Sequence, residues 1–295
     1  MKRSLLLFSG ILVLGLAGPA RAASLISLNF TGTLPPAEQQ TFSDAAAFWN
    51  SVITGYDLVY DAYGITQAHA LNIDVSVTDI DGSGGVLGSA GWDQARYYDN
   101  NPIGQPTMAL WYASHGAMEF DSADVTTMVS SNMFYAVVLH EMAHVLGVGT
   151  LWSYETDLNG TTYHLYDPGT GQYDGPNALA AWRSEFDRPD DTYVPVELGG
   201  GTGTADGHWN EVDGGAGLTG IVSNLTGMDM RDELMTGWAS NAFFLSRATV
   251  GTLDDLGYEV DYSKAGVINY IMAPEPSLSA LVWLGTLAGM RRRRK

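Results

Sequence analysis

Cysteine is absent from this sequence of 295 residues, and positively charged residues and histidine are scarce. Without cysteine, the chain can form neither a disulfide bond nor a thiol-based latency switch, whatever the redox compartment. Residues 23–273 hold only six Lys and Arg against 32 Asp and Glu. A surface of that charge repels nucleic acid and anionic lipid, so we expect no nucleic-acid partner and a soluble, extracellular protein.

The N-terminal 22 residues have the pattern of a signal peptide. Met1-Lys2-Arg3 is basic, Leu5 to Gly18 is apolar, and Ala20-Arg21-Ala22 places small residues at the cleavage positions. We therefore predict export with removal after Ala22, and removal after Ala23 is the second choice. A retained membrane anchor is the alternative, although the apolar run is short for a membrane span.

The last 22 residues contain three parts in sequence. Pro274-Glu275-Pro276 precedes a mostly apolar run from Ser277 to Met290, and five basic residues follow. A helix of that run would reach about 21 Å, short of the roughly 30 Å hydrocarbon core. The order resembles the PEP-CTERM sorting signal of Gram-negative bacteria. That resemblance implies cleavage by an exosortase-type enzyme, transient membrane contact through the tail, and release to the cell surface or matrix. An uncleaved tail anchor is the alternative.

The segment His140-Glu141-Met142-Ala143-His144 carries the strongest chemical signal in the chain. Residues four apart share one face of a helix, so His140 and His144 can offer two imidazoles to one metal ion. Glu141 is placed to take a proton from a water that zinc activates, as in zinc hydrolases. The apolar stretch before His140 predicts a buried helix, with a cap among residues 130–132. Gly147 suits a chain that leaves a helix at positive φ.

A third ligand is needed, because a catalytic zinc site usually has three protein ligands and one open position. The pattern H-E-x-x-H-x-x-G-x-x-H would put a histidine at position 150, where this chain has Thr150. Of the other histidines, His208 and His164 are the candidates for this ligand. The remaining two, His69 and His115, are expected to be structural or solvent-facing.

The chain resembles the leishmanolysin-like metallopeptidases, metzincins in which an insertion separates the turn glycine from the third zinc histidine. The resemblance covers about residues 40–262 and rests on His140 to Trp152, His208-Trp209 and Asp232-Glu233-Leu234-Met235. Leishmanolysin itself is rich in disulfides and is made with a cysteine-bearing propeptide, and this chain departs from both features.

The resemblance implies a role for each matching residue: zinc ligands at His140, His144 and His208, the general base at Glu141, and a Met-turn methionine beneath the ligands at Met235. On residue chemistry alone, His208 could also be a surface-loop histidine, and Met235 could be ordinary core, because methionine fills irregular apolar gaps.

Asp79 and Asp81 lie at alternate positions of a glycine-rich turn, a carboxylate spacing that hard cations favour. Calcium binding is one interpretation, and a plain turn is the other. No twelve-residue EF-hand loop with its terminal Glu is completed here.

Periodicity predicts the strands and helices of an α+β fold. The resemblance implies the metzincin plan for them, with a mixed sheet and the active-site helix in an N-terminal lobe, and a loop-rich C-terminal lobe. The alternation of Leu71 to Val77 indicates a strand with one buried face. Further predicted strands are 25–30, 86–90, 108–112, 117–120 and 258–260. Predicted helices are 42–53, capped by Ser43 or Asp44, 177–186, and 246–256, which ends at Gly257.

Together these patterns divide the chain into a signal peptide (1–22), a metallopeptidase domain (23–273, with lobes at about 23–150 and 151–273) and a sorting signal (274–295). The trimmed chain is long enough for one sizeable core or two lobes around a cleft. The expected function is that of a secreted zinc endopeptidase acting on proteins or peptides. The alternatives are a non-catalytic surface or matrix protein on the same scaffold, and another zinc amide hydrolase.

Overall fold

The computed structural model describes residues 25–56, 60–61, 70–99, 109–154, 156–158, 161–215, 217–240 and 242–269. The predicted signal peptide, the predicted sorting signal and His69 lie outside these residues. Within them, no helix has both the length and the apolar character needed to cross a membrane.

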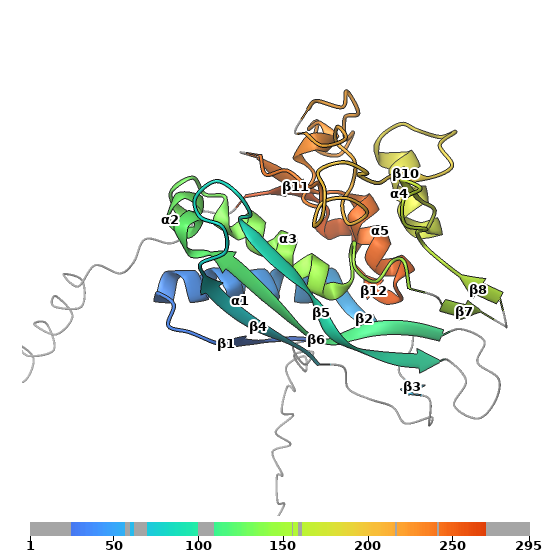
Figure 1. The fold of residues 1–295 in the computed structure, drawn as a ribbon. Coiled ribbons are helices and arrows are strands. Elements are labelled where there is room, and N and C mark those ends of the chain that lie inside the picture. The colour runs from blue at the N-terminus through green and yellow to red at the C-terminus, as the bar shows by residue number, and fades with distance from the viewer. Residues whose placement is uncertain are drawn as a thin grey trace, which may run out of the picture.

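The N-terminal half is built on a mixed five-stranded sheet, as the sequence predicted (Figure 1). Three neighbouring strands are parallel to one another. Two more strands extend the sheet on one side, and each of them is antiparallel to the strand before it. In spatial order the strands are β1 (Ile26–Phe30), β4 (Leu71–Thr78), β6 (Ala109–Asp121), β5 (Gly88–Asp99) and β3 (Tyr60–Asp61). On β4, Leu71, Ile73 and Val75 are buried and the residues between them are not, which confirms the predicted alternation.

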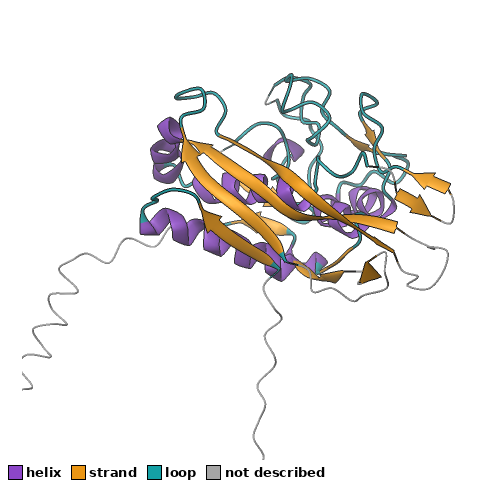
Figure 2. Ribbon diagram, turned by 60° about the horizontal axis from the view of Figure 1, so that its bottom comes forward, coloured by secondary structure: helices purple, strands orange, loops and turns teal. Residues whose placement is uncertain are grey.

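Helices α1 (Pro36–Val52) and α3 (Phe134–Leu146) pack side by side on one face of the sheet, and Figure 2 looks at the opposite face. The indole N–H of Trp49 on α1 donates to the carbonyl oxygen of Leu139 on α3, 3.1 Å away. Phe42, Phe120 and Phe134 form an edge-to-face cluster between the layers, with ring centroids 5.2–5.7 Å apart. Each such pair adds about 0.5–1.5 kcal/mol beyond its buried area.

Several predicted boundaries in this half are wrong. Helix α1 begins at Pro36 rather than after Ser43, because proline lacks the N–H that is unpaired at a first helical position. The predicted strands 108–112 and 117–120 are one strand, β6, because β4 and β5 pair with it on both sides. Helix α3 has no side-chain cap, and α2 (Ser122–Ser130), which was not predicted, leads directly into it.

The C-terminal half consists mainly of loops around two helices that pack against each other, α4 (Pro176–Glu185) and α5 (Arg247–Asp255) (Figure 1). Both helices and the turn at Gly257, where φ is +92°, agree with the predicted pattern. Small pairings complete this half: β7 (Thr156–Leu158) with β8 (Thr161–Tyr163), β9 (Gln172–Tyr173) with β10 (Val194–Pro195), and β11 (Phe243–Leu245) with β13 (Gly266–Ile268).

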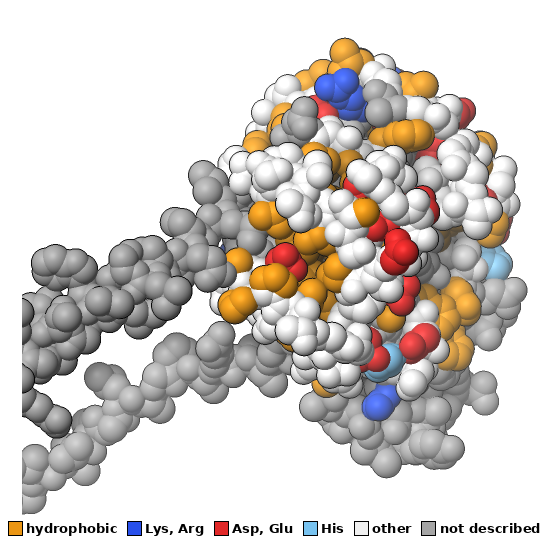
Figure 3. Space-filling model, turned by 60° about the vertical axis from the view of Figure 1, so that its left-hand side comes forward, with side chains coloured by type: hydrophobic (Ala, Val, Ile, Leu, Met, Phe, Trp, Pro, Cys, Tyr) orange, Lys and Arg blue, Asp and Glu red, His pale blue; other side chains and the backbone are white. Residues whose placement is uncertain are grey.

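Two tyrosine hydroxyls connect residues 257–258 to the N-terminal half. Strand β12 (Tyr258–Val260), as predicted, is a strand, and it pairs with β2 (Ile53–Tyr56). The hydroxyl of Tyr258 donates to the carbonyl oxygen of Leu146 at the end of α3, and that of Tyr112 donates to Gly257. Short 3-10 turns cover Met230–Asp232 and Tyr262–Lys264. On the face drawn in Figure 3, acidic side chains outnumber Lys and Arg.

Candidate metal centre

Helix α3 carries His140 and His144 into the middle of the molecule. Every residue of this helix except His140 is buried, so its axis is fixed by packing on all sides. The helix ends at Gly147, whose φ of +117° is the left-handed cap conformation that glycine favours. The chain therefore turns back directly after the second histidine, as the sequence predicted.

His208 reaches the same point from a distant part of the sequence. Its segment runs against the turn that follows α3, where a Cβ at Gly149 would overlap the carbonyl oxygen of Gly207. Gly149 has φ +75°, so both its conformation and this close approach call for glycine. The amide N–H of Glu197 donates to the carbonyl oxygen of His208 at 2.9 Å and holds the segment from the other side.

The Nε2 atoms of the three histidines converge. They are separated by 3.0 Å between His140 and His144 and by 3.1 Å from each of these to His208. Each Nδ1–H donates to a backbone carbonyl: that of Leu234 at 2.6 Å for His140, of Val148 at 2.9 Å for His144, and of Thr204 at 2.9 Å for His208. These bonds fix the tautomer and leave three Nε2 lone pairs facing one another.

This donor set fits zinc. Zn–N bonds of about 2.0–2.1 Å in a tetrahedral site put ligand nitrogens roughly 3.3 Å apart, close to the spacing here. Burial lowers the pKa of all three imidazoles, to about 3 for His208, so the neutral forms that bind metal are favoured. Among the described residues, these histidines are the one group of three His, Asp or Glu that could share a metal ion.

The other described histidines lie elsewhere. The ring of His115 on β6 is held by the Asp93 carboxylate at 2.7 Å and lies 3.7 Å from that of Asp74. The half-buried His164 is not part of the cluster, so it does not take the place of His208.

The Glu141 side chain is buried beside the histidines and against the start of β5. A Cβ placed on Gly88 would lie 3.1 Å from both Cγ and Oε1 of Glu141. Burial raises the pKa of Glu141 to about 8. A carboxyl group in this environment holds a proton more readily than one in water, which suits a group that accepts and then returns a proton near neutral pH.

The family model Peptidase M8, described as leishmanolysin, matches residues 112–274, which include all three histidines and Met235. The chain belongs to the leishmanolysin family. It is also 29% identical over 158 residues to a leishmanolysin homolog of Crithidia fasciculata. That match covers 52% of this chain and 21% of the relative, so the chain spans about a fifth of that protein's length.

The segment around Met235 supports the metal centre of this leishmanolysin-family chain through its backbone. The carbonyl of Leu234 accepts the His140 ring N–H, and that of Met235 accepts the N–H of Trp209, the residue after His208. The Met235 side chain is fully buried. One short segment thus positions two histidines that lie 68 residues apart.

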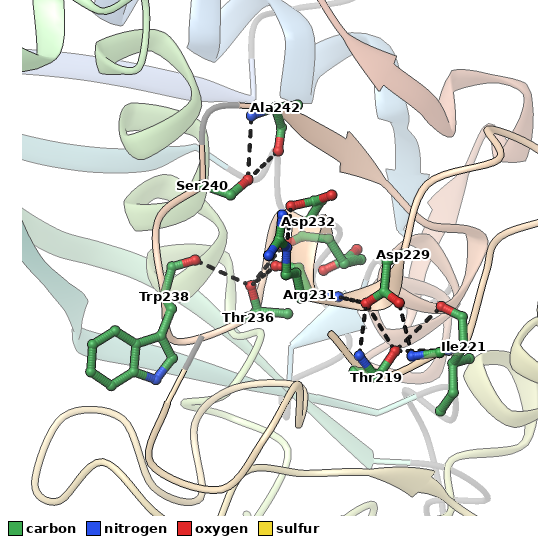
Figure 4. Close-up of polar contacts among 11 residues, drawn as sticks. Thr219, Ile221, Asp229, Arg231, Asp232, Thr236, Trp238, Ser240 and Ala242 are labelled. Atoms are coloured by element: carbon green, nitrogen blue, oxygen red, sulfur yellow. Dashed lines mark hydrogen bonds and ion pairs between the residues drawn. The ribbon is translucent and has the colours of Figure 1, made fainter. Parts of the chain in front are cut away.

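Glu233 anchors this segment, a role that residue patterns did not indicate. Its buried carboxylate accepts from the N–H of Met235, the N–H and hydroxyl of Ser246, and the hydroxyl of Thr249. These bonds tie the segment to the start of α5. In Figure 4 the Thr236 hydroxyl bridges neighbouring carbonyls, while Asp229 accepts from the backbone and hydroxyl of Thr219.

The centre lies in a cleft of about 880 Å³. One wall is the loop and strand from Val86 to Ala90, and another is the segment that contains Trp238. Val86 and Trp238 remain 44% and 40% exposed, so the cleft offers apolar surface beside the histidines. Tyr166, hydrogen-bonded to Asp206, lines the side formed by the loop before His208.

The turn at Asp79 and Asp81 is held by backbone amides. The Asp81 carboxylate accepts from the N–H of Val86, and Asp121 accepts from the N–H groups of Asp81 and Gly82. These bonds account for a stable turn without an ion. Calcium at Asp79 and Asp81 remains a prediction.

Proposed function

We propose that this leishmanolysin-family protein is an exported zinc endopeptidase. The observation that carries the proposal is the convergence of three Nε2 lone pairs within 3.0–3.1 Å, next to the buried Glu141, in an open cleft. A purely structural zinc site is normally closed by four protein ligands, whereas this one offers three and leaves the cleft side free.

His140, His144 and His208 would hold the zinc ion, with their rings oriented by the three carbonyl acceptors. Bound zinc would supply Lewis acidity, which lowers the pKa of water and polarises a carbonyl group. Glu141 takes a proton from the attacking water and passes it to the amine of the leaving peptide. Its burial next to Gly88 holds the carboxyl group in place and limits competing water.

A peptide is the substrate class that suits the cleft. Residues Gly88–Ala90 of β5 line it, and on the side away from β6 β5 pairs only with β3, at Tyr98 and Asp99, among the described residues. Such an edge can accept an extended peptide as an added strand through main-chain hydrogen bonds. Val86 and Trp238 would contact apolar side chains of that peptide.

Export and processing complete the proposal. Residues 1–22 would direct export, residues 23–273 would form the peptidase, and residues 274–295 would be cut by an exosortase-type enzyme after transient membrane contact. The mature protein would then act at the cell surface or in the extracellular matrix of a Gram-negative bacterium. The excess of acidic residues in 23–273 is consistent with a function outside the cell and without a nucleic-acid partner.

One paired measurement tests the activity. Zinc per chain is determined by elemental analysis of the purified protein, and cleavage of casein or a peptide library is followed with and without phenanthroline. We expect one zinc and cleavage that phenanthroline abolishes. One zinc without cleavage would favour a binding scaffold, and a protein without zinc would contradict the assignment of the three histidines. Cleavage products would also distinguish an endopeptidase from another zinc amide hydrolase.

A further inference from the structure

A second group of oxygen ligands lies beside the segment that carries His208. Glu197 and Glu211 are 0% and 5% exposed, yet Oε2 of Glu197 and both carboxylate oxygens of Glu211 have no hydrogen-bond partner among the described residues. The Oδ1 atom of Asn210 is also buried and without a partner there. Buried carboxylates without hydrogen bonds are costly unless a cation balances them.

Hydrogen bonds bring the segments that carry these groups together. The other oxygen of Glu197, Oε1, accepts from the N–H of Gly199 at 2.6 Å and from that of Gly214 at 2.8 Å. The second bond brings Gly214, three residues after Glu211, to the Glu197 side chain. The Asn210 side-chain NH₂ donates to Asp213 at 2.8 Å, which leaves its Oδ1 as an available acceptor.

The negative charge of Glu197 and Glu211 also favours a bound cation. Burial raises the pKa of Glu211 to about 8. The neighbouring negative charges of Glu197 and Asp213 contribute to that rise, and the backbone amides of Glu211 and Gly237 oppose it. Neither carboxylate of the pair forms an ion pair with Lys or Arg in the part of the chain that the structure describes. Two buried acids close enough to affect each other, without a basic partner, are a site at which a cation relieves a large electrostatic cost.

We propose that Glu197 and Glu211, assisted by Asn210, bind a calcium ion next to the segment that carries His208. All the available ligand atoms are oxygens, and calcium takes six to eight oxygen ligands in flexible geometry, with water completing the shell. Asp213, which is exposed and accepts a hydrogen bond from Asn210, adds negative charge nearby. This site is separate from the turn at Asp79 and Asp81.

Calcium here would hold the third histidine in position. The backbone N–H of Glu197 donates to the carbonyl of His208, and the N–H of Asn210 donates to that of Pro195. Glu197 and Glu211 therefore lie on two paired segments, and the segment of Glu211 is the one that carries His208. A cation shared by Glu197 and Glu211 therefore joins these segments by their side chains as well as by their backbones.

The test uses the purified protein, freed of calcium on a chelating resin and then given one equivalent of zinc. Calcium chloride is titrated by calorimetry, and the unfolding temperature is measured with calcium, with equal magnesium and with neither. We expect one calcium per chain and a rise of roughly 5 to 10 °C at about 100 times the Kd. Zinc content of the same samples shows whether a failure belongs to the zinc site.

Variants locate the ion. Glu211→Gln and Glu197→Gln should abolish the calcium shift, Asn210→Ala should weaken binding by about tenfold, and the double variant Asp79→Asn/Asp81→Asn should leave the shift unchanged. If Glu211→Gln does not fold, Asn210→Ala still reports on the site.

The proposal is overturned if wild type does not respond to calcium, or if the shift survives in Glu211→Gln or is lost in the Asp79/Asp81 variant. It is also overturned if Glu211→Gln raises the calcium-free unfolding temperature and calcium leaves wild type unchanged, because the two acids would then share a proton.

Discussion

The ring N–H of His140 donates to the carbonyl oxygen of Leu234 across 2.6 Å, although 94 residues separate them in the chain. Leu234 directly precedes Met235, whose own carbonyl accepts the N–H of Trp209 beside His208. The backbone of Leu234 and Met235, the methionine segment, thus connects His140 on helix α3 to the loop that carries His208. Because such hydrogen bonds fix the orientation of a histidine ring, this segment determines whether the Nε2 atoms of the three histidines can converge.

Replacement of Glu141 by Gln separates metal binding from proton transfer. The amide has nearly the shape of the acid but cannot accept the proton of a water molecule, so turnover should fall by roughly 100- to 10,000-fold. Zinc per chain should stay at the wild-type level, since the group that could hold the metal ion consists of the three histidines and does not include Glu141. Initial rates on casein and elemental analysis of the same sample test this. A Glu141→Gln protein with full activity would rule out the proposed base.

Removal of the His208 ring should take away one of three metal ligands. We expect His208→Ala to bind zinc more than about 100-fold more weakly, and cleavage to be lost at trace zinc. His115→Ala and His164→Ala are matched controls, because neither ring belongs to the cluster. Zinc affinity is measured by competition with a chromogenic chelator. Stoichiometric zinc retained by His208→Ala would show that another group is the third ligand.

Local signals were enough for the metal-binding helix and its turn. The apolar periodicity before His140, the i, i+4 histidines and Gly147 are all encoded within one short stretch, so helix α3 follows from the sequence. Helix α2 has weak helix formers, Thr and Val, and was missed. The Asp121 side chain, which accepts from the N–H of Ala123, was its one available signal.

Long-range contacts determined the rest. Spacing left His164 and His208 as alternatives, and only family resemblance preferred His208. In the structure, the pairing of Glu197 with His208 and the close approach of Gly149 to Gly207 place that ring, and neither contact has a local pattern. Strand β6 was predicted as two pieces, because its middle, Ala113 to Gly116, is small and polar. Pairing with β4 and β5 carries the strand through it.

Gly88 should be needed for activity and not for folding. A methyl group there would lie 3.1 Å from the Glu141 side chain, tighter than ordinary contact, so the carboxyl group must shift. We expect Gly88→Ala to lower kcat by roughly 10- to 100-fold while zinc content is unchanged. Gly91→Ala on the same strand is the control, since a Cβ there meets nothing within 4 Å. Equal kcat values for the two variants would contradict the proposed contact.

Glu233 should contribute to stability through the bonds that hold the methionine segment to α5. Glu233→Gln turns one acceptor into a donor facing other donors, which should cost about 1–3 kcal/mol of unfolding free energy. Urea denaturation of wild type and variant gives the difference. Glu259→Gln, an exposed change on β12, should leave the midpoint within error. If both variants unfold at the wild-type midpoint, the Glu233 bonds do not support the fold.

The buried Asp255 should make stability depend on pH. Burial raises its pKa from 3.8 to about 7, although it accepts from the N–H groups of Asn177 and Ala178 and from the Tyr173 hydroxyl. Because the folded state holds this proton more tightly than the unfolded state, ionisation penalises folding as pH rises from about 4 to 7. The wild-type unfolding free energy should therefore fall, relative to Asp255→Asn, by up to about 1.4 kcal/mol per pH unit across that window and level off above it. Urea denaturation of both proteins at several pH values measures this, and a difference that is constant or grows with pH would contradict the raised pKa.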